Sequence, residues 1–196
     1  MAKKNGEPFG LDVDLSSVVA AAMGVKLELR IMPFAELMPA LVSEKIDVII
    51  SGMTMTPRRN LKIAFVGPYF ITGKGILTKR ANIEKTKGLT TLNNVDITLA
   101  ALNKSTSQQF IEQRILLAKL NTYNDVEDAV LALIDDEVVA MIADYHSCVA
   151  YAMRFQDEEL VAGAAQFTFE ALGIAMPPND PLLHNWFPQP ARQPAG

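Results

Sequence analysis

The chain has 196 residues, of which 49% are apolar and 20% are charged, and its formal net charge is −4. This composition is that of a globular α/β protein with enough core for one large or two small domains. The acidic balance offers no basic stripe to neutralise phosphates, which argues against a nucleic-acid partner. The longest apolar runs, such as residues 138–143, are far too short to cross a bilayer.

The single cysteine, Cys148, excludes an intrachain disulfide and leaves the redox compartment open. The first residues lead directly into Gly6-Glu7-Pro8-Phe9, without the apolar segment of a secretory signal. We therefore expect a mature, shortened or recombinant chain, or else a cytosolic protein.

Helices and strands alternate in the first part of the chain. The pattern predicts helices over residues 15–23, with Gly24 as a stop, and over residues 34–44. It predicts strands over residues 26–31 and 46–50. Strands separated by helices favour parallel pairing in a sheet that is covered on both faces.

The segment that follows the second of these strands is the most informative in the chain. Ser51 and Gly52 are small enough to let backbone N–H groups approach a ligand. Thr56 suits a helix N-cap and Pro57 suits the first helical position. Arg59 then lies in the first turn, where the helix dipole favours negative charge, so an anionic ligand would explain its presence. The alternative is a well-capped helix with solvated arginines.

A second α/β series follows residues 65–75, where Gly and Pro punctuate an extended stretch typical of a connection between two lobes. Six of the eleven prolines lie from residue 177 on, and we expect a poorly ordered tail after about Trp186. The pattern predicts strands at residues 95–102, 118–123, 138–143 and 167–176, and helices at residues 107–114, 125–135 and 147–155.

Three of the predicted strands end in polar residues: Ser51-Gly52, the loop at residues 103–106, and Asp144. Ligands of open α/β sheets bind beyond the carboxyl ends of the strands. Ser105 and Thr106, with two glutamines following, resemble a capping box, whose free N–H groups suit a carboxylate or phosphate. Capping alone, and a turn role for Asp144, are the structural alternatives.

Arginine and aspartate together fit an α-amino acid. An arginine can hold a carboxylate through two parallel hydrogen bonds, and an aspartate can take an ammonium. Arg59 and Asp144 would therefore match the two charges of a zwitterion.

Five segments, in this order, resemble a type 3 periplasmic solute-binding protein, the amino-acid receptor of ABC importers. The resemblance runs from about residue 5 to about residue 186 and rests on residues 6–15, 34–41, 46–59, 129–134 and 140–144. It implies a two-lobe periplasmic binding protein-like fold (type II). Each lobe would be a mostly parallel sheet flanked by helices, with hinge strands near residues 71–77 and 170–174. Lobe 1 would comprise residues 1–74 and 172–196, and lobe 2 residues 75–171.

The same resemblance implies the roles of the site residues. Arg59 would hold the ligand α-carboxylate, Asp144 would receive its ammonium, and the two lobes would close around the ligand. Phe34 would stack on the ligand side chain, or else be a core aromatic at helical spacing from residues 37 and 38. Further hydrogen bonds to the carboxylate would come from Ser51, Gly52, Thr54, Ser105 and Thr106.

The implied partners are an amino acid or similar small solute and the membrane permease subunits of an ABC importer. The implied location is periplasmic or extracellular, and neither a cofactor nor a metal is expected. Members of this family carry a strand before residue 6 and a helix after residue 186, so the chain is expected to be shortened at both ends. Exposed strand edges of lobe 1 would then favour strand exchange, a homo-oligomer or a partly disordered lobe. Lys104 stands at a position where members of this family usually have glycine.

An enzyme on the same fold is the main alternative. A cyclohexadienyl or arogenate dehydratase would use Glu170 or Asp144 as general acid. His146 and Cys148 point in different directions from a helix start, which disfavours a nucleophilic pair. The chain shows no metal-ligand spacing, phosphate-binding glycine loop or serine elbow. We therefore predict a binding protein and not an enzyme; the ligand-binding module of a sensor is a third alternative.

Overall fold

The computed structural model describes residues 2–4, 7–164 and 166–187, and the chain forms two compact units. Unit 1 comprises Met1–Met32, Glu36–Ile71 and Ala171–Gly196, and unit 2 comprises Pro33–Ala35 and Thr72–Glu170. The tail expected after Trp186 falls almost entirely on residues 188–196, which lie outside the described residues. In the described part of the chain, no helix has the length and apolar character needed to span a membrane.

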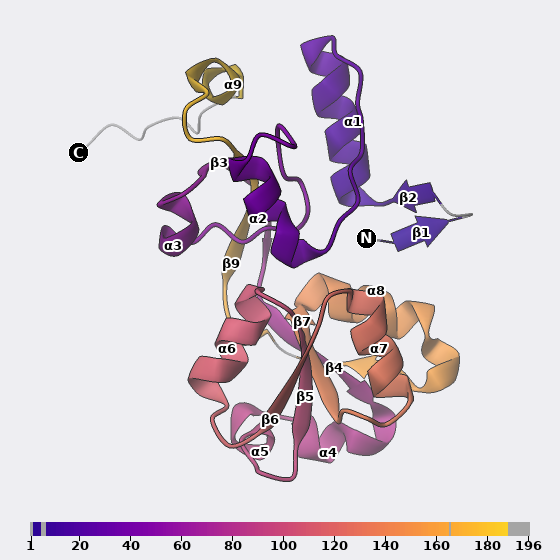
Figure 1. The fold of residues 1–196 in the computed structure, drawn as a ribbon. Coiled ribbons are helices and arrows are strands. Elements are labelled where there is room, and N and C mark those ends of the chain that lie inside the picture. The colour runs from indigo at the N-terminus through magenta and orange to yellow at the C-terminus, as the bar shows by residue number, and fades with distance from the viewer. Residues whose placement is uncertain (1, 5–6, 165, 188–196) are drawn as a thin grey trace, which may run out of the picture. The chain divides into compact units, whose positions relative to one another are not determined.

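Unit 2 is built on a five-stranded sheet with the strand order β6-β5-β7-β4-β8 (Figure 1). β5 pairs in parallel with β6 and β7, whereas β4 pairs antiparallel with β7 and β8. The strands are β4 (Lys74–Lys79), β5 (Thr98–Leu102), β6 (Lys119–Tyr123), β7 (Ala140–Asp144) and β8 (Leu160–Ala162). The helices are η1 (Arg80–Asn82), α4 (Ile83–Thr86), α5 (Leu89–Leu92), α6 (Thr106–Arg114), α7 (Val126–Ile134), α8 (Tyr145–Arg154) and η2 (Gln156–Glu158).

Alternating side chains of these strands fill two apolar layers, one on each face of the sheet. On one face, residues of the three central strands pack against α7 and α8; they include Leu77, Ala100, Met141, Leu133 and Cys148. On the other face, their sequence neighbours pack against α5 and α6; they include Ile76, Leu99, Ile142, Leu92 and Ile111. A sheet covered by helices on both faces was expected, and this part of the prediction is confirmed.

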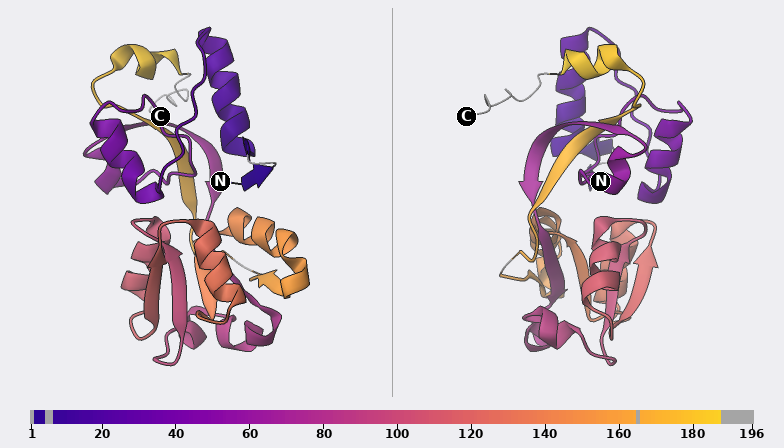
Figure 2. Two further views of the ribbon diagram at one scale, coloured as in Figure 1. Left: turned by 45° about the vertical axis from the view of Figure 1, so that its right-hand side comes forward. Right: turned by 90° about the vertical axis from the view of Figure 1, so that its left-hand side faces the viewer.

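Unit 1 is dominated by helices and by two long strands. β3 (Ala64–Thr72) and β9 (Glu170–Met176) form a two-stranded sheet and run side by side in both views of Figure 2. A short antiparallel hairpin joins β1 (Ala2–Lys4) and β2 (Glu7–Phe9). The helices are α1 (Leu11–Met23), α2 (Phe34–Val42), α3 (Pro57–Asn60) and α9 (Pro181–Trp186). The apolar cluster of this unit contains Ile50, Val66, Ile174, Met176 and Phe187.

The strand predicted at residues 46–50 is reduced to an isolated bridge, and its pairing is antiparallel. Ile49 exchanges backbone hydrogen bonds with Ala175 of β9, and Thr54 forms a second antiparallel bridge with Leu172. Between the two bridges, Gly52 adopts a φ of +59°, which bends the chain away from β9. The apolar run was identified correctly, but the bend prevents a continuous ladder.

The strand predicted at residues 26–31 is wrong. These residues form neither helix nor strand, and Leu29 and Ile31 are exposed. Their alternation gives strand propensity, but a strand also needs a hydrogen-bonding neighbour, and none of the described strands pairs with this segment.

The helix predictions are confirmed within a few residues. α1 begins earlier than expected, at Leu11, and ends at Gly24, whose φ of +68° caps the helix in the left-handed conformation. α6 begins after Ser105 and α7 after Asp125, and both of these residues cap their helix through the side chain. The two-lobe α/β fold class is therefore correct. The sheet of unit 2 is mixed in direction, because the predicted hinge segment supplies the antiparallel strand β4.

Candidate functional site

Arg59 is held in place by the short helix α3. Thr56 is the N-cap, its hydroxyl oxygen accepts a hydrogen bond from the Arg59 N–H (3.2 Å), and Pro57 begins the helix, as predicted. The side chain of Arg59 is buried, whereas that of Arg58 is exposed. Arg59 Nη1 donates a hydrogen bond to the Thr54 carbonyl oxygen (2.8 Å). Arg59 is thus not a solvated arginine, and one edge of its guanidinium is oriented by a backbone carbonyl.

The loop before α3 is fixed by a pair of residues that the sequence did not reveal. The N–H of Gly52 donates to the Tyr69 hydroxyl (3.0 Å), which in turn donates to Asp12 Oδ1 (2.7 Å). An acidic residue in the first turn of a helix is ordinary, so nothing in the sequence marked Asp12 as a partner of residue 69. If the Gly52 N–H also contacts a ligand, as predicted, it must be shared between the ligand and the Tyr69 hydroxyl.

In unit 2, Asp144 ends β7 and forms an ion pair with a buried lysine. Lys74 lies directly opposite Asp144 in the antiparallel pairing of β4 with β7, so both side chains project from the same face. Lys74 Nζ lies 2.6 Å from Asp144 Oδ1, and Lys74 is only 1% exposed. The described residues supply no donor to the other oxygen, Oδ2, and no buried side-chain oxygen among them lacks a partner, so Oδ2 is open to solvent.

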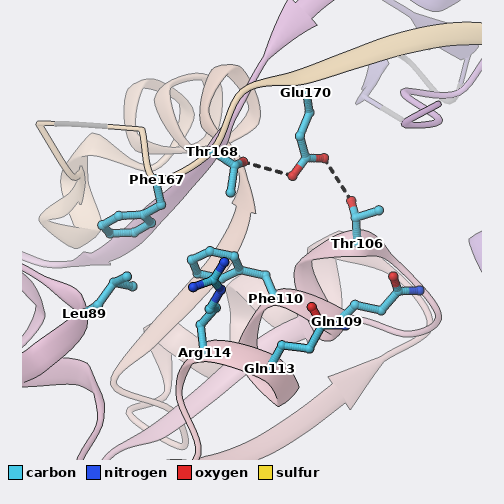
Figure 3. Close-up of a pocket in the computed structure, with 9 residues that line it drawn as sticks. All are labelled: Leu89, Thr106, Gln109, Phe110, Gln113, Arg114, Phe167, Thr168 and Glu170. Carbon is cyan, nitrogen blue, oxygen red and sulfur yellow. Dashed lines mark hydrogen bonds between the residues drawn. The ribbon is translucent and has the colours of Figure 1, made fainter. Parts of the chain in front are cut away.

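Lys74 also forms an ion pair with a second carboxylate, that of Glu170. Glu170 Oε2 lies 3.0 Å from Lys74 Nζ and accepts a hydrogen bond from the Thr106 hydroxyl (3.1 Å). Glu170 Oε1 accepts from the Thr168 hydroxyl (2.9 Å), and Figure 3 shows both threonines directed at the carboxylate. The hydroxyl oxygen of Thr168 also accepts from the backbone N–H of Lys74 (2.8 Å). We call Lys74, Asp144 and Glu170, with Thr106 and Thr168, the carboxylate cluster.

Ser105 and Thr106, the two hydroxyl residues predicted at the site in unit 2, have different roles. Thr106 belongs to the carboxylate cluster, whereas Ser105 caps α6. The Ser105 hydroxyl donates to the Leu102 carbonyl (2.6 Å) and accepts from the Gln108 N–H (3.2 Å), as in the structural alternative of helix capping. Gln108 Oε1 accepts from the N–H of Lys104 (2.7 Å). Lys104 has a φ of +57°, a left-handed conformation that favours glycine, so a lysine at this position strains the backbone.

A hollow of about 370 Å³ lies within unit 2, between α6 and the segment that leads into β9 (Figure 3). Glu170, Thr106 and Thr168 form its polar end. The rings of Phe110 and Phe167 stack at its other end, with their centroids 5.9 Å apart. The hollow is also lined by Leu89, Gln109, Gln113 and Arg114.

The remaining candidates are placed as follows. Phe34 is half-buried at the start of α2, and its stacking role stays a prediction. Burial raises the pKa of the Cys148 thiol to about 12, helped by the charge of Asp144, so this cysteine is no nucleophile at neutral pH. His146 Nδ1 lies 3.2 Å from the Thr72 hydroxyl oxygen. Within the described residues, no group of three or more His, Cys, Asp and Glu side chains could hold a metal ion.

Lys74 and Thr168 are site residues that were not predicted from the sequence. Lys74 stands in a stretch that was assigned to a connection between lobes, where a lysine is unremarkable. Its significance arises from the pairing of β4 with β7, two strands far apart in the sequence, and local periodicity does not say which strands become neighbours.

The sequence matches the bacterial extracellular solute-binding proteins, family 3, over residues 1–187. A probable histidine-binding protein of Campylobacter jejuni is 29% identical over 160 residues, which are 82% of this chain and 60% of the relative. The chain thus spans less than two thirds of the length of this curated relative.

Solved structures are also similar. A putative binding component of an ABC transporter from Wolinella succinogenes, complexed with lysine, is 35% identical, with a TM-score of 0.87 over 95% of this chain and 80% of the other. An ancestral amino acid-binding protein, described as a precursor of cyclohexadienyl dehydratase, is 34% identical, with a TM-score of 0.86 over 94% of this chain and 78% of the other. With the family match covering nearly the whole described chain, the protein belongs to the bacterial extracellular solute-binding proteins, family 3.

Proposed function

We propose that this protein binds an amino acid and delivers it to an ABC importer. Membership of the solute-binding family supports the transport role, and the relatives named for histidine, arginine and lysine support an amino acid as ligand. The observation that carries the proposal is the pair of held charges: a buried arginine oriented by a carbonyl in unit 1, and a carboxylate with one open oxygen in unit 2.

Each charge suits one end of a zwitterion. Arg59 takes the ligand α-carboxylate, because a guanidinium offers two parallel donors to a carboxylate. Asp144 takes the α-ammonium through Oδ2. Ser51, Gly52, Thr54, Ser105 and Thr106 add hydrogen bonds, and Phe34 stacks on the ligand side chain. A ligand that contacts both units stabilises their closed arrangement. Micromolar affinity, which is about −8 kcal/mol, is in keeping with two charge-assisted anchors.

We also propose a periplasmic or extracellular location, with the permease subunits of the importer as protein partners. The family description supports the location. Self-association through strand edges of unit 1 belongs to the same proposal, and size-exclusion chromatography with light scattering tests it. A monomer at all concentrations contradicts self-association.

Turnover is less well supported than binding. One structural relative is described as a precursor of a dehydratase, and Glu170 and Asp144 are the candidate general acids. Both carboxylates are instead engaged in ion pairs with the buried Lys74 ammonium, at 2.6 and 3.0 Å. We therefore infer binding without chemistry. Loss of a cyclohexadienyl substrate on incubation with the protein would contradict this inference.

The test of the proposed function is calorimetric titration with each of the twenty amino acids, followed by the variant Arg59→Lys. Lysine keeps the charge but cannot form the two parallel hydrogen bonds, so we expect affinity to fall by about 100-fold, in line with the loss of a charge-assisted anchor. Arg58→Lys is the matched control, because Arg58 is adjacent and exposed. Equal affinity in Arg59→Lys overturns the role of Arg59, and no binding of any amino acid by the unaltered protein overturns the function.

A further inference from the structure

The chain bends at residues 50–52, which include two of the proposed ligand contacts, Ser51 and Gly52. On one side of the bend Ile49 forms an antiparallel bridge with β9, and on the other side Thr54 forms a second one. These bridges hold the two ends of the bend. Gly52, with a φ of +59°, is a residue type with little conformational preference of its own. The shape of the bend therefore depends on what holds its middle.

The middle of the bend is held by Tyr69 of β3. The Gly52 N–H donates to the Tyr69 hydroxyl (3.0 Å), and no other backbone group of residues 50–52 is hydrogen-bonded to the described residues. The ring of Tyr69 packs against the apolar cluster of unit 1, which includes Ile50 and Val66. Packing thus fixes the ring, and the hydroxyl at its tip fixes Gly52.

Asp12 of α1 sets the direction of that hydroxyl. A tyrosine hydroxyl has one proton to donate and lone pairs with which to accept. Tyr69 donates its proton to Asp12 Oδ1 (2.7 Å), which leaves its lone pairs for the Gly52 N–H. We call Asp12, Tyr69 and Gly52 the unit 1 relay. It connects a helix, a strand and the bend by two hydrogen bonds in series.

We propose that Tyr69 and Asp12 are positioning residues of the ligand site, which hold residues 50–52 in the shape that receives the ligand carboxylate. This inference rests on the proposed function, in which the bend donates hydrogen bonds to that carboxylate. A ligand that meets a bend already in its bound shape has no backbone to order. Without the relay, binding must itself order these three residues, and the loss of their conformational entropy weakens the affinity.

A merely structural role for Tyr69 and Asp12 makes different predictions. The two residues also join α1 to β3, so their removal lowers stability in either case. A structural role leaves the affinity of the folded protein unchanged. The relay makes the affinity depend on both residues, and it makes their effects non-additive, because Asp12 acts on the bend through the Tyr69 hydroxyl.

The experiment is calorimetric titration with L-histidine, L-arginine and L-lysine, at a temperature at which every variant is folded. Tyr69→Phe keeps the ring and should lower affinity by about tenfold, the order expected for one lost hydrogen bond. Asp12→Ala should lose part of this factor, and Asp12→Asn, which keeps an acceptor for the hydroxyl, should lose less. In the Tyr69→Phe background, Asp12→Ala should cause no further loss, since no hydroxyl is left to orient. Unchanged affinity in Tyr69→Phe, or additive losses in the double variant, overturns the proposal.

The chain offers a matched control for each residue. Asp14 also lies in the first turn of α1, but it is exposed, and the described residues provide no hydrogen-bond partner for its side chain. Tyr123 is a half-buried tyrosine of β6 in unit 2, and its hydroxyl forms no hydrogen bond with the described residues. Asp14→Ala and Tyr123→Phe should both keep the affinity of the unaltered protein. A loss in either control as large as that of Tyr69→Phe overturns the proposal.

A ligand-free measurement separates this proposal from the proposed function. Hydrogen exchange of the Gly52 amide, followed by NMR, should be faster by about tenfold in Tyr69→Phe, because the acceptor of that N–H is gone. The rate is compared with that of the Ile49 amide, which donates to the Ala175 carbonyl (2.8 Å) and reports on the opening of unit 1 as a whole. A Gly52 amide whose relative rate is unchanged overturns the proposal, even if amino acids bind. If protection is lost as expected while none of the three amino acids binds, the relay is supported and the proposed function fails.

Discussion

The two units hold their candidate ligand groups by different means. In unit 2, Asp144 is fixed by the ion pair with Lys74, on strands of a five-stranded sheet with an apolar layer on each face. In unit 1, Arg59 is fixed by a backbone carbonyl and a four-residue helix, and the sheet there has two strands and two isolated bridges. The first arrangement leaves little room for adjustment, whereas the second depends on loops and side chains.

This difference predicts how each unit tolerates an added atom. At Gly73, beside the cluster of unit 2, the nearest neighbour is the backbone of Thr168, in a segment that is hydrogen-bonded to Lys74. At Gly173 of β9 in unit 1, the nearest neighbours are the side chains of Met55 and Phe65. The same substitution should therefore be far more damaging in unit 2, and glycine-to-alanine changes test this.

Gly73→Ala should give the largest effect. A Cβ at residue 73 would overlap the Thr168 carbonyl oxygen, and residues 167 and 168 are hydrogen-bonded to Lys74 and so cannot yield. We expect a loss of about 3 kcal/mol in the free energy of unfolding, measured in urea. In unit 1, a Cβ at Gly173 would meet Met55 Cγ and Sδ at 2.7 and 2.9 Å and Phe65 Cδ1 at 2.9 Å; all three are side-chain atoms, and the methionine can move. Gly173→Ala should therefore lose about 1 kcal/mol. Equal losses would contradict the contrast between the units.

The sequence predicted the elements of unit 2 better than those of unit 1 for the same physical reason. The apolar pattern and length of residues 138–143 predicted a strand, and β7 lies at Ala140–Asp144. Residues 26–31 and 46–50 have similar patterns, but whether they become strands depends on neighbours distant in the sequence. The residue pattern of a segment indicates its burial and its strand propensity, but its pairing partners are determined by the whole fold.

The candidate site was predictable to the extent that its signals are local. The cap at Thr56 and the start of α6 at Ser105 follow from residue type and spacing, and both are confirmed. The partners of these residues were not predictable, because Lys74 and Asp144 are 70 residues apart and Tyr69 and Asp12 are 57 apart. The first pair depends on which strands become neighbours in the sheet and the second on how α1 packs against β3, and local residue patterns determine neither.

Tyr69→Phe should have an intermediate effect that is confined to unit 1. The substitution removes the hydroxyl that accepts from the Gly52 N–H and donates to Asp12, while the ring is kept. Loss of a hydrogen bond to a charged group predicts a destabilisation of about 1.5–3 kcal/mol in urea unfolding. Asp12→Asn is the companion variant, because it keeps an acceptor but removes the charge, and it should lose less. A loss below 0.5 kcal/mol in Tyr69→Phe, on the order expected for a surface change, would show that unit 1 adjusts around this contact.

Labelling of Cys148 reports on the opening of unit 2 alone, and the smallest effect that we expect is that of Tyr69→Phe on this labelling. Cys148 is the only cysteine in the chain, it lies on the buried side of α8 in an apolar layer of unit 2, and burial raises its pKa to about 12. Because the pKa is raised, the thiol remains protonated at pH 8, with roughly one thiolate in ten thousand, so a thiol reagent must wait for unit 2 to open. Labelling at pH 8 should therefore be slow, unchanged in Tyr69→Phe, and about 100-fold faster in Gly73→Ala, whose expected loss of stability increases the open population by that factor. Labelling that accelerates equally in both variants would show that the two units open together, so that the firmer packing of unit 2 gives it no separate stability.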